Sequence, residues 1–260
     1  MSTRHITFEG VAFGYRTSHG EVLSGLNLEL RKGEFFLLLG PSGCGKTTVL
    51  NLLAGFERPP AGQISVGGTP VTAPGPDRVV IFQGDDSLLG WLSTVENVEF
   101  GLVLAGVPRA ERRRRAERAL HMVGLTGQDR KYPHELSGGM KQRVQIARAL
   151  VCEADVLLMD EPFAALDAQT RATLQDELAR IWTETRRTIL FITHDIGEAI
   201  ILGDRIGVMR AGPGSSIKEV VANDLPRPRS RGDPAFAAMY ARIERAVSEE
   251  VKRTMRRETQ

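Results

Sequence analysis

The chain has 260 residues, 42 % of them hydrophobic, which is enough apolar material for one large globular domain or two small ones. Its 34 Lys and Arg and 32 Asp and Glu leave a formal charge of +2, so the balance does not call for a nucleic-acid partner. Residues 1–8 lack a signal-peptide pattern, and no stretch approaches the roughly 20 apolar residues that cross a bilayer. We therefore expect a soluble chain that reaches a membrane only by docking onto another subunit.

The N-terminal part of the chain is predicted to form mainly strands. Hydrophobic residues alternate with polar ones over residues 6–13 and again over Leu26–Leu30, which indicates antiparallel strands with one exposed face. After a turn at Lys32–Gly33, the nearly continuous apolar run Glu34–Leu39 indicates a strand buried on both faces. A helix, a turn rich in proline and a short strand over Gln63–Val66 are predicted to follow.

A glycine-rich loop lies directly after the buried strand and fits the pattern G-x-x-x-x-G-K-[ST]. In such a loop, backbone N–H groups point inward at a triphosphate, and the next helix, here Lys46–Ala54, adds the positive end of its dipole. Lys46 is expected to reach the β- and γ-phosphates and Thr47 to bind Mg²⁺. A turn without a ligand is the alternative, but the flanking strand and helix favour phosphate. The expected phosphate-binding residues are Gly40, Ser42, Gly43, Cys44, Gly45, Lys46, Thr47 and Thr48.

The two cysteines, Cys44 and Cys152, cannot form a disulfide framework, and one of them lies inside the loop, which indicates a reducing compartment. Because no second thiol lies near Cys44 in the sequence, a small loop residue is favoured over a redox switch.

Two amphipathic helices are predicted in the middle of the chain, one beginning at Thr94 and one over Arg109–Val123. The four arginines at residues 112–115 permit a nucleic-acid interpretation. Glu111 and Glu117 lie at helical pairing distance from them, so a solvated face is favoured.

Buried strands alternate with helices in the rest of the chain. The further predicted strands are Val79–Gln83, Val156–Met159, Thr188–Ile192, Arg205–Met209 and Ile217–Val221. The further predicted helices are one capped by Ser137, Gln169–Thr183, one from Asp195 to Leu202, and Pro234–Val247. This alternation around a phosphate loop specifies an α/β fold with a largely parallel sheet.

Two acids end the predicted strand Val156–Met159. Asp160 is placed to hold the Mg²⁺ shell, and Glu161, one residue further out, could polarise an attacking water. Two solvated acids at a strand end are the alternative interpretation of this pair.

The segment Leu136–Arg143, with the sequence LSGGMKQR, resembles the signature of ABC transporter ATPases. Further positions match this family in its own order over residues 4–225: Tyr15 resembles its adenine-stacking aromatic, Gln83 its Q-loop glutamine, Asp167 its D-loop aspartate and His194 its switch histidine. The resemblance implies a P-loop NTPase ABC ATPase core with a parallel sheet, an N-terminal antiparallel β subdomain and a helical subdomain at about residues 84–150. We expect one such domain over residues 1–250 and a frayed tail at 251–260.

The resemblance also implies an ATP- and Mg²⁺-dependent enzyme. Lys46, Glu161 and His194 are the implied catalytic residues, and Thr47, Gln83 and Asp160 the implied metal ligands. Ser137, Gly138 and Gly139 offer a hydroxyl and N–H groups at a helix start, where anions bind. They are implied to meet the γ-phosphate held by a second copy, so that two ATP molecules are sandwiched in a dimer.

Three segments look most like ATPase subunits of nitrate, sulfonate and taurine importers: residues 75–83, residues 88–92 and Leu225–Arg229. Gly84 and Gly90 depart from that group's pattern. The implied partners are a membrane permease and, indirectly, a solute-binding protein, at the cytoplasmic face of the membrane. A soluble ABC protein acting on nucleic acid or ribosomes would need a coiled-coil insertion or a second cassette, and a small-molecule kinase would leave Leu136–Gly139 and His194 without roles.

Overall fold

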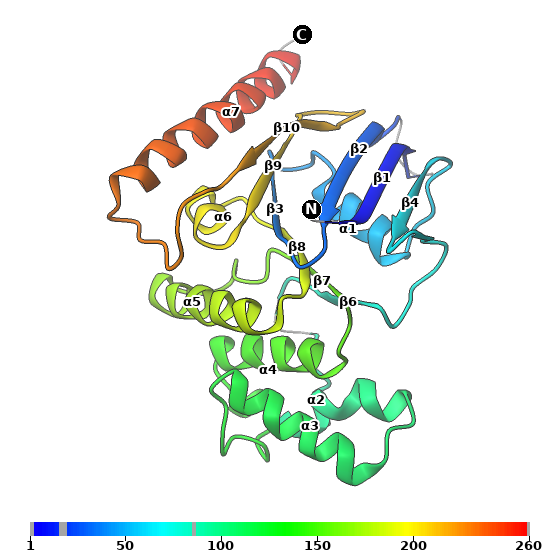
Figure 1. Cartoon of the computed structure of the whole chain (residues 1–260), viewed down its shortest axis with the longest axis vertical. Coiled ribbons are helices and arrows are strands. Elements are labelled where there is room, and N and C mark those ends of the chain that lie inside the picture. Colours follow the sequence, from blue (N-terminus) through cyan, green and yellow to red (C-terminus); the bar gives the residue numbers. More distant parts are fainter. Residues whose placement is uncertain (1–2, 16–19, 85–86, 259–260) are drawn as a thin grey trace. The chain divides into compact units, whose positions relative to one another are not determined.

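The computed structural model describes residues 3–15, 20–84 and 87–258 (Figure 1). The internal contacts divide the chain into two compact units, one made of Met1–Gly75 with Arg186–Gln260 and the other of Pro76–Thr185. A single domain over residues 1–250, with a helical subdomain at about 84–150, stays a prediction.

An antiparallel sheet forms the N-terminal part of the first unit. Its strands, in spatial order, are β2 (Leu23–Arg31), β1 (Arg4–Phe13), β4 (Ala61–Val66) and β5 (Thr69–Pro70). Side chains of β1 alternate between the core and solvent, so that Ile6 and Phe8 are buried whereas Glu9 is exposed. The antiparallel N-terminal sheet predicted from this alternation is confirmed, and β5 is a strand that the sequence did not indicate.

Parallel pairing organises the other strands of the first unit. They are, in spatial order, β10 (Ile217–Ala222), β9 (Arg205–Met209), β3 (Phe35–Leu39) and β8 (Thr188–Ile192). The central strand β3 is parallel to both neighbours, with Leu37 opposite Ile206 and Phe191. All five residues of β3 are buried, as expected for a strand covered on both faces. Only β10 runs antiparallel, against β9.

Three helices belong to the first unit: α1 (Lys46–Ala54), α6 (Ile196–Leu202) and α7 (Pro234–Glu258). They pack on β8, β3 and β9 respectively. Helix α7 runs past Val247, where the sequence analysis ended it, and continues to Glu258, while the frayed tail at residues 251–260 stays a prediction. Thr259 and Gln260 lie outside the described residues.

The second unit contains two parallel strands and a group of helices. Its elements are β6 (Arg78–Ile81), α2 (Thr94–Leu104), α3 (Arg109–Met122), the 3₁₀ helix η1 (Pro133–Glu135), α4 (Gly138–Val151), β7 (Val156–Asp160) and α5 (Ala168–Thr185). Helices α2, α3 and α4 pack on one another. Strand β6 pairs in parallel with β7 and ends before Gln83, which the sequence analysis had placed inside the strand.

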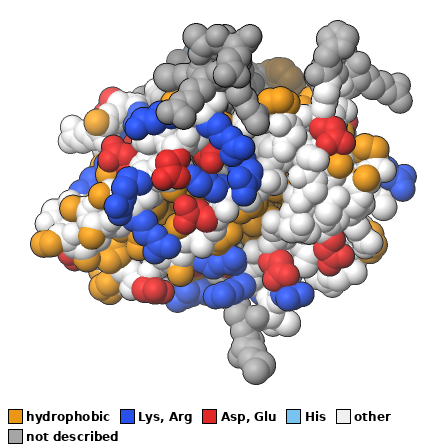
Figure 2. All heavy atoms as spheres, turned by 90° about the horizontal axis from the view of Figure 1, so that it is seen from above, with side chains coloured by type: hydrophobic (Ala, Val, Ile, Leu, Met, Phe, Trp, Pro, Cys, Tyr) orange, Lys and Arg blue, Asp and Glu red, His pale blue; other side chains and the backbone are white. Residues whose placement is uncertain are grey.

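The arginine run of α3 forms the predicted solvated face. Glu111 binds Arg114 and Arg115 at 2.6 and 2.7 Å, and Glu117 binds Arg113 at 3.1 Å. Hydrogen bonds from Arg115 and Arg114 lower the pKa of Glu111 to about 2. Figure 2 shows the same interspersion of charges on one face of the molecule, where Lys and Arg side chains lie among Asp and Glu side chains. In the part of the chain that the structure describes, no helix is long and apolar enough to span a bilayer.

Candidate functional site

The phosphate loop connects β3 to α1 in the first unit. Gly45 precedes α1 with φ of 93°, a left-handed conformation that side chains disfavour. A Cβ at Gly45 would also lie 2.9 Å from Leu23 Cδ2. The Nζ of Lys46 donates to the carbonyls of Gly40 and Pro41 at 2.8 and 3.0 Å, and the side chain is buried. The loop therefore holds its ammonium group at the place where the motif expects phosphate.

Cys44 packs inside this loop. Its thiol is buried, and a Cβ at Gly40 would lie 2.7 Å from the sulfur. Burial raises the pKa of the Cys44 thiol, against a smaller opposing effect of the Lys46 charge. A protonated, buried thiol is a poor nucleophile, which favours packing over redox chemistry.

Tyr15 lies beside the start of α1. Its hydroxyl is 3.4 Å from the Thr48 hydroxyl, and its ring meets the Phe13 ring edge-on at a centroid distance of 4.9 Å. The sequence gives no reason for the contact with Thr48, because Tyr15 and Thr48 are far apart along the chain. The structure thus brings the expected adenine-stacking residue next to the expected phosphate loop.

His194 lies at the same edge of the sheet as the phosphate loop. Leu38 of β3 pairs with Ile192 of β8, and Gly40 and His194 each follow two residues beyond this pair. The two strands are parallel, so their carboxyl ends meet at one edge, where ligands of α/β sheets bind. His194 is exposed, and the next residue, Asp195, caps α6 by accepting the Glu198 N–H at 2.9 Å.

The second unit repeats this arrangement with other residues. Ile81 of β6 pairs in parallel with Met159 of β7, and Gln83 and Glu161 each follow two residues beyond the pair. Asp160 and Glu161 are half-buried, and Glu161 adopts φ of 44°. A left-handed backbone at a non-glycine residue is strained, and such strain concentrates at functional sites. The structure therefore groups the two expected acids with the expected Q-loop glutamine.

The signature segment begins helix α4. The Ser137 hydroxyl accepts the Met140 N–H at 3.3 Å, so Ser137 is the predicted N-cap. A Cβ at Gly139 would lie 2.6 Å from Thr170 Cγ2 on α5. Thr170 donates its N–H to Asp167 at 3.0 Å, and this bond is the main cause that lowers the pKa of Asp167. The expected D-loop aspartate thus caps α5 beside the signature.

Two residues near Gln83 were missed by sequence reasoning. The Gln145 amide donates to the carbonyl of Gly84 at 2.9 Å, and the Arg148 guanidinium donates to the carbonyl of Ser87 at 2.8 Å. Both side chains come from α4, the helix that begins with the signature. The sequence signal that could have found Gln145 and Arg148 is their position as polar residues among apolar ones in this helix. They tie the chain on either side of residues 85–86 to the signature helix.

The oxygen donors that suit Mg²⁺ occur in both units. Thr47 offers a hydroxyl in the first, and Asp160 and Gln83 offer a carboxylate and an amide in the second. Among the described residues, no three His, Cys, Asp or Glu side chains are grouped so as to hold a metal ion. Mg²⁺ usually takes one or two carboxylates of a protein and shares the phosphate oxygens of a substrate.

A groove of about 880 Å³ lies within the second unit, between α2, the start of α3 and residues 129–132. Its wall includes Trp91, which is 75 % exposed, and Phe100 and Val103. This exposure shows that Trp91 does not pack inside the helices. Leu88, in contrast, is buried.

The comparisons identify the family. Residues 23–164 match the family model described as ABC transporter. The taurine import ATP-binding protein TauB of Chromobacterium violaceum is 47 % identical over 245 residues, covering 92 % of this chain and 94 % of that protein. The bicarbonate transport ATP-binding protein CmpD of Synechocystis sp. is 47 % identical over 243 residues, covering 90 % of this chain and 86 % of that protein.

A solved structure agrees with these relatives. A dimeric ATP-binding cassette in a post-hydrolysis state, bound to ADP and Pi, matches with a TM-score of 0.70 and 28 % identity, covering 86 % of this chain and 99 % of that chain. The predicted fold class and the predicted ATPase activity are confirmed. This chain is an ATP hydrolase and belongs to the ABC transporter family.

Proposed function

We propose that the chain powers the import of a small anion or organosulfonate, such as nitrate, sulfonate or taurine, through a separate membrane permease at the cytoplasmic face of the membrane. The observation that carries this proposal is the similarity, over more than nine-tenths of both chains, to a protein named for taurine import. A relative named for bicarbonate transport extends the support to other small anions. The solute itself would contact a permease and a solute-binding protein. Isolating the chain from membranes with both partners, and screening solutes on the latter, tests the proposal.

The proposed division of roles in ATP hydrolysis follows the two units. In the first, Lys46 and the N–H groups of the loop bind phosphate, Thr47 is a Mg²⁺ ligand, Tyr15 stacks on adenine and His194 senses the γ-phosphate. In the second, Gln83 and Asp160 are Mg²⁺ ligands and Glu161 orients and polarises the attacking water. The bound Mg²⁺ would neutralise charge on the transferred phosphoryl group.

These roles predict different defects for two substitutions. Lys46→Ala removes the charge on the phosphates and should abolish ATP binding or hydrolysis. Glu161→Gln should retain ATP binding and stop turnover, because the amide cannot activate water. Binding of a fluorescent ATP analogue and phosphate release measure the two steps separately. Turnover of Glu161→Gln within a few-fold of the parent would remove Glu161 from the catalytic role.

The signature is proposed to complete the ATP site of a second copy. Ser137 is exposed at the start of α4, so the anion-binding end of this helix is accessible. In a Glu161→Gln background, Lys46→Ala and Gly138→Asp should each prevent ATP-dependent dimers, since every site then lacks one half. Mixing the two variants creates one intact site and should restore dimers. Both substitutions on one chain, mixed with an otherwise unmodified partner, should not. Equal dimer yields in the two mixtures would place the whole site within one chain.

The groove is proposed to receive a short helix of the permease. Three of its lining side chains, Trp91, Phe100 and Val103, are large, apolar and exposed, which is better explained by a partner than by solvent. Trp91 lines the groove, whereas Leu88 is buried and does not offer its side chain. Trp91→Ala should therefore uncouple transport while basal ATP hydrolysis is largely kept. Leu104→Ala is the matched control, because Leu104 is also 75 % exposed but does not line the groove. Normal transport by assembled Trp91→Ala would contradict this role.

A further inference from the structure

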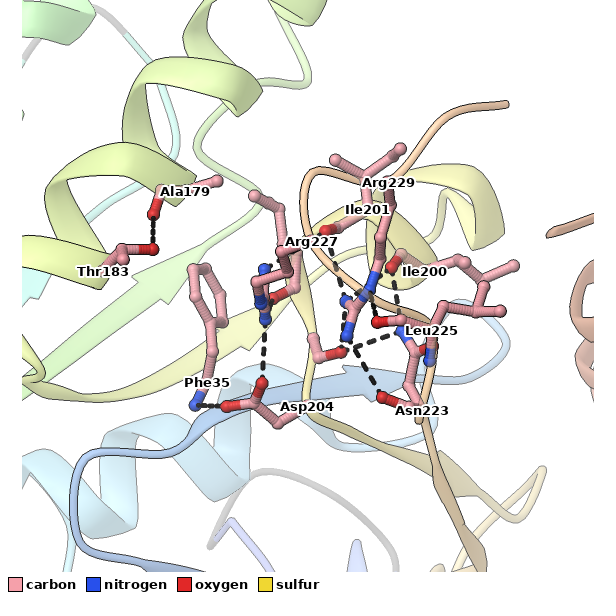
Figure 3. A network of polar contacts seen from close by, with 12 residues as sticks. Phe35, Ala179, Thr183, Ile200, Ile201, Asp204, Asn223, Leu225, Arg227 and Arg229 are labelled. Atoms are coloured by element: carbon pink, nitrogen blue, oxygen red, sulfur yellow. Dashed lines mark hydrogen bonds and ion pairs between the residues drawn. The ribbon is translucent and has the colours of Figure 1, made fainter. Parts of the chain in front are cut away.

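The segment Asn223–Arg229 follows β10 and contains Leu225–Arg229, the stretch that resembles importer ATPases but has no role in the proposed function. We call this segment the arginine strap. Figure 3 shows Arg227 and Arg229 beside the end of α6, together with Asn223 and Asp204. All of these residues belong to the first unit.

The strap supplies donors to the carbonyl end of α6. A helix leaves its last carbonyls without partners inside the helix. The carbonyl of Ile200 accepts from Arg229 Nη1 and Asn223 Nδ2, both at 2.8 Å. The carbonyl of Gly203 accepts from the same two atoms at 2.7 and 2.9 Å. Arg227 Nη2 donates to the carbonyl of Leu202. Three side chains of one short segment thus satisfy this helix end.

The interaction is also electrostatic. The carbonyl end of a helix carries partial negative charge, and two guanidinium groups lie against it. Burial is the main cause that lowers the pKa of Arg229, to about 10, so the group stays cationic at neutral pH. Helix α6 has only seven residues, too few to be stable by itself, so it depends on such contacts and on packing.

The same strap reaches the strand that leads to the phosphate loop. Arg227 Nη2 donates to Asp204 Oδ1 at 2.9 Å, and Asp204 Oδ2 accepts the Phe35 N–H at 3.0 Å. Phe35 is the first residue of β3, and the phosphate loop follows the last. One ion pair therefore fixes the end of α6 against the start of β3.

We propose that Arg229, with Arg227, is a positioning residue that orients His194 beside the phosphate loop. His194 immediately precedes Asp195, the N-cap of α6. At 1.5 Å per residue the helix is only about 10 Å long, so a displacement of its carbonyl end would be transmitted through one short element to His194. The inference rests on the catalytic role proposed for His194. It adds that the strap makes that role possible by holding the opposite end of the helix.

The test is a double-mutant cycle on kcat of the purified full-length chain. Arg229→Met should lower kcat by about tenfold to a hundredfold with little change in KM for ATP, since a misplacement of about 1 Å can cost about a hundredfold. Arg229→Lys keeps the charge and should recover part of the rate. In a His194→Ala background, Arg229→Met should lower kcat no further. Lys218→Met is the matched control, because Lys218 donates to a helix carbonyl of α7, at Ala246, in the same unit. It should leave kcat unchanged.

Two kinetic outcomes and one NMR outcome would contradict the proposal, and they can be told apart. An equal loss from Arg229→Met with and without His194 would overturn the positioning role, because the strap would then act by another route. A His194→Ala variant with the parent kcat would instead overturn the proposed role of His194 itself. If Arg229→Met does not fold, Arg227→Gln leaves every Arg229 bond in place and should give a smaller, equally His194-dependent loss. The His194 ring resonance in NMR should shift in each active strap variant, and an unchanged resonance would overturn the proposal.

Discussion

Asn97 offers a quantitative test of how the groove wall is built. Its side chain is fully buried, accepts the Leu89 N–H at 2.8 Å, and donates to the carbonyls of Leu89, Leu92 and Ser93 at 3.0, 3.0 and 3.1 Å. At about 0.5–1 kcal/mol for each hydrogen bond, Asn97→Ala should lower the free energy of unfolding by about 2–4 kcal/mol. Urea unfolding followed by circular dichroism measures this change.

Asn97→Asp sharpens the test because it keeps the shape of the side chain. The carboxylate still accepts the Leu89 N–H but turns an oxygen toward three carbonyl oxygens, so it should be at least as destabilising as alanine. Asn27 is the matched control, since it is exposed and, among the residues that the structure describes, makes two such bonds, with Gly10 and Gly25. Both substitutions there should cost less than about 1 kcal/mol. An Asn97→Asp variant within about 0.5 kcal/mol of the parent would refute the reasoning, because packing alone would then explain the buried asparagine.

Three further predictions concern the stability of Gly55 and Glu34 variants and the labelling rates of the two cysteines. Gly55→Ala should lower the free energy of unfolding in urea by about 1–3 kcal/mol more than Gly10→Ala does. Both glycines have positive φ, but a Cβ at Gly55 would lie 2.4 Å from the Ala73 backbone, whereas a Cβ at Gly10 would meet nothing within 4 Å. Equal costs would contradict this reasoning. Burial raises the pKa of Glu34 above its ordinary 4.5, so the stability it contributes is complete below pH 4.5 and lost as the pH rises through the folded pKa. The stability of Glu34→Gln relative to the parent should therefore increase from pH 4 to pH 7, and a flat difference would count against it. Iodoacetamide at pH 8 should label half-buried Cys152 faster than buried Cys44, which mass spectrometry can follow, and faster labelling of Cys44 would contradict the packing role.

The strands and most helices were predictable because their hydrophobic patterns are strong. The continuous apolar run of β3 and the alternation of β1 each match the burial that the structure shows. The end of α7 was not predictable in this way, since its last turns are rich in charged residues that suit a frayed tail equally well. One of its acids, Glu250, is in fact buried and accepts the Ala211 N–H at 2.9 Å. A charged residue in a sequence does not reveal such a backbone partner.

The polar networks were also beyond the sequence, for a related reason. Asn97, Gln145 and Arg229 each bind backbone groups, and a backbone group leaves no trace in residue type. Arg229 resembled a family position, yet its partners on α6 lie more than twenty residues away along the chain. Patterns of hydrophobicity indicate whether a side chain is buried. They do not report which carbonyl a buried guanidinium or amide will find.

The grouping of the catalytic candidates, in contrast, follows from parallel pairing. A buried strand must end where the chain leaves the core, so the first polar residues after it collect at one edge of the sheet. The pairs Leu38 with Ile192 and Ile81 with Met159 place their followers at the same offset in each unit. Gly40 lies beside His194 for the same physical reason that Gln83 lies beside Glu161. Strand order and parallel direction are therefore enough to group the candidates within each unit, whereas the proposed meeting of the signature with the phosphate loop of a second copy is tested by the mixed-variant experiment.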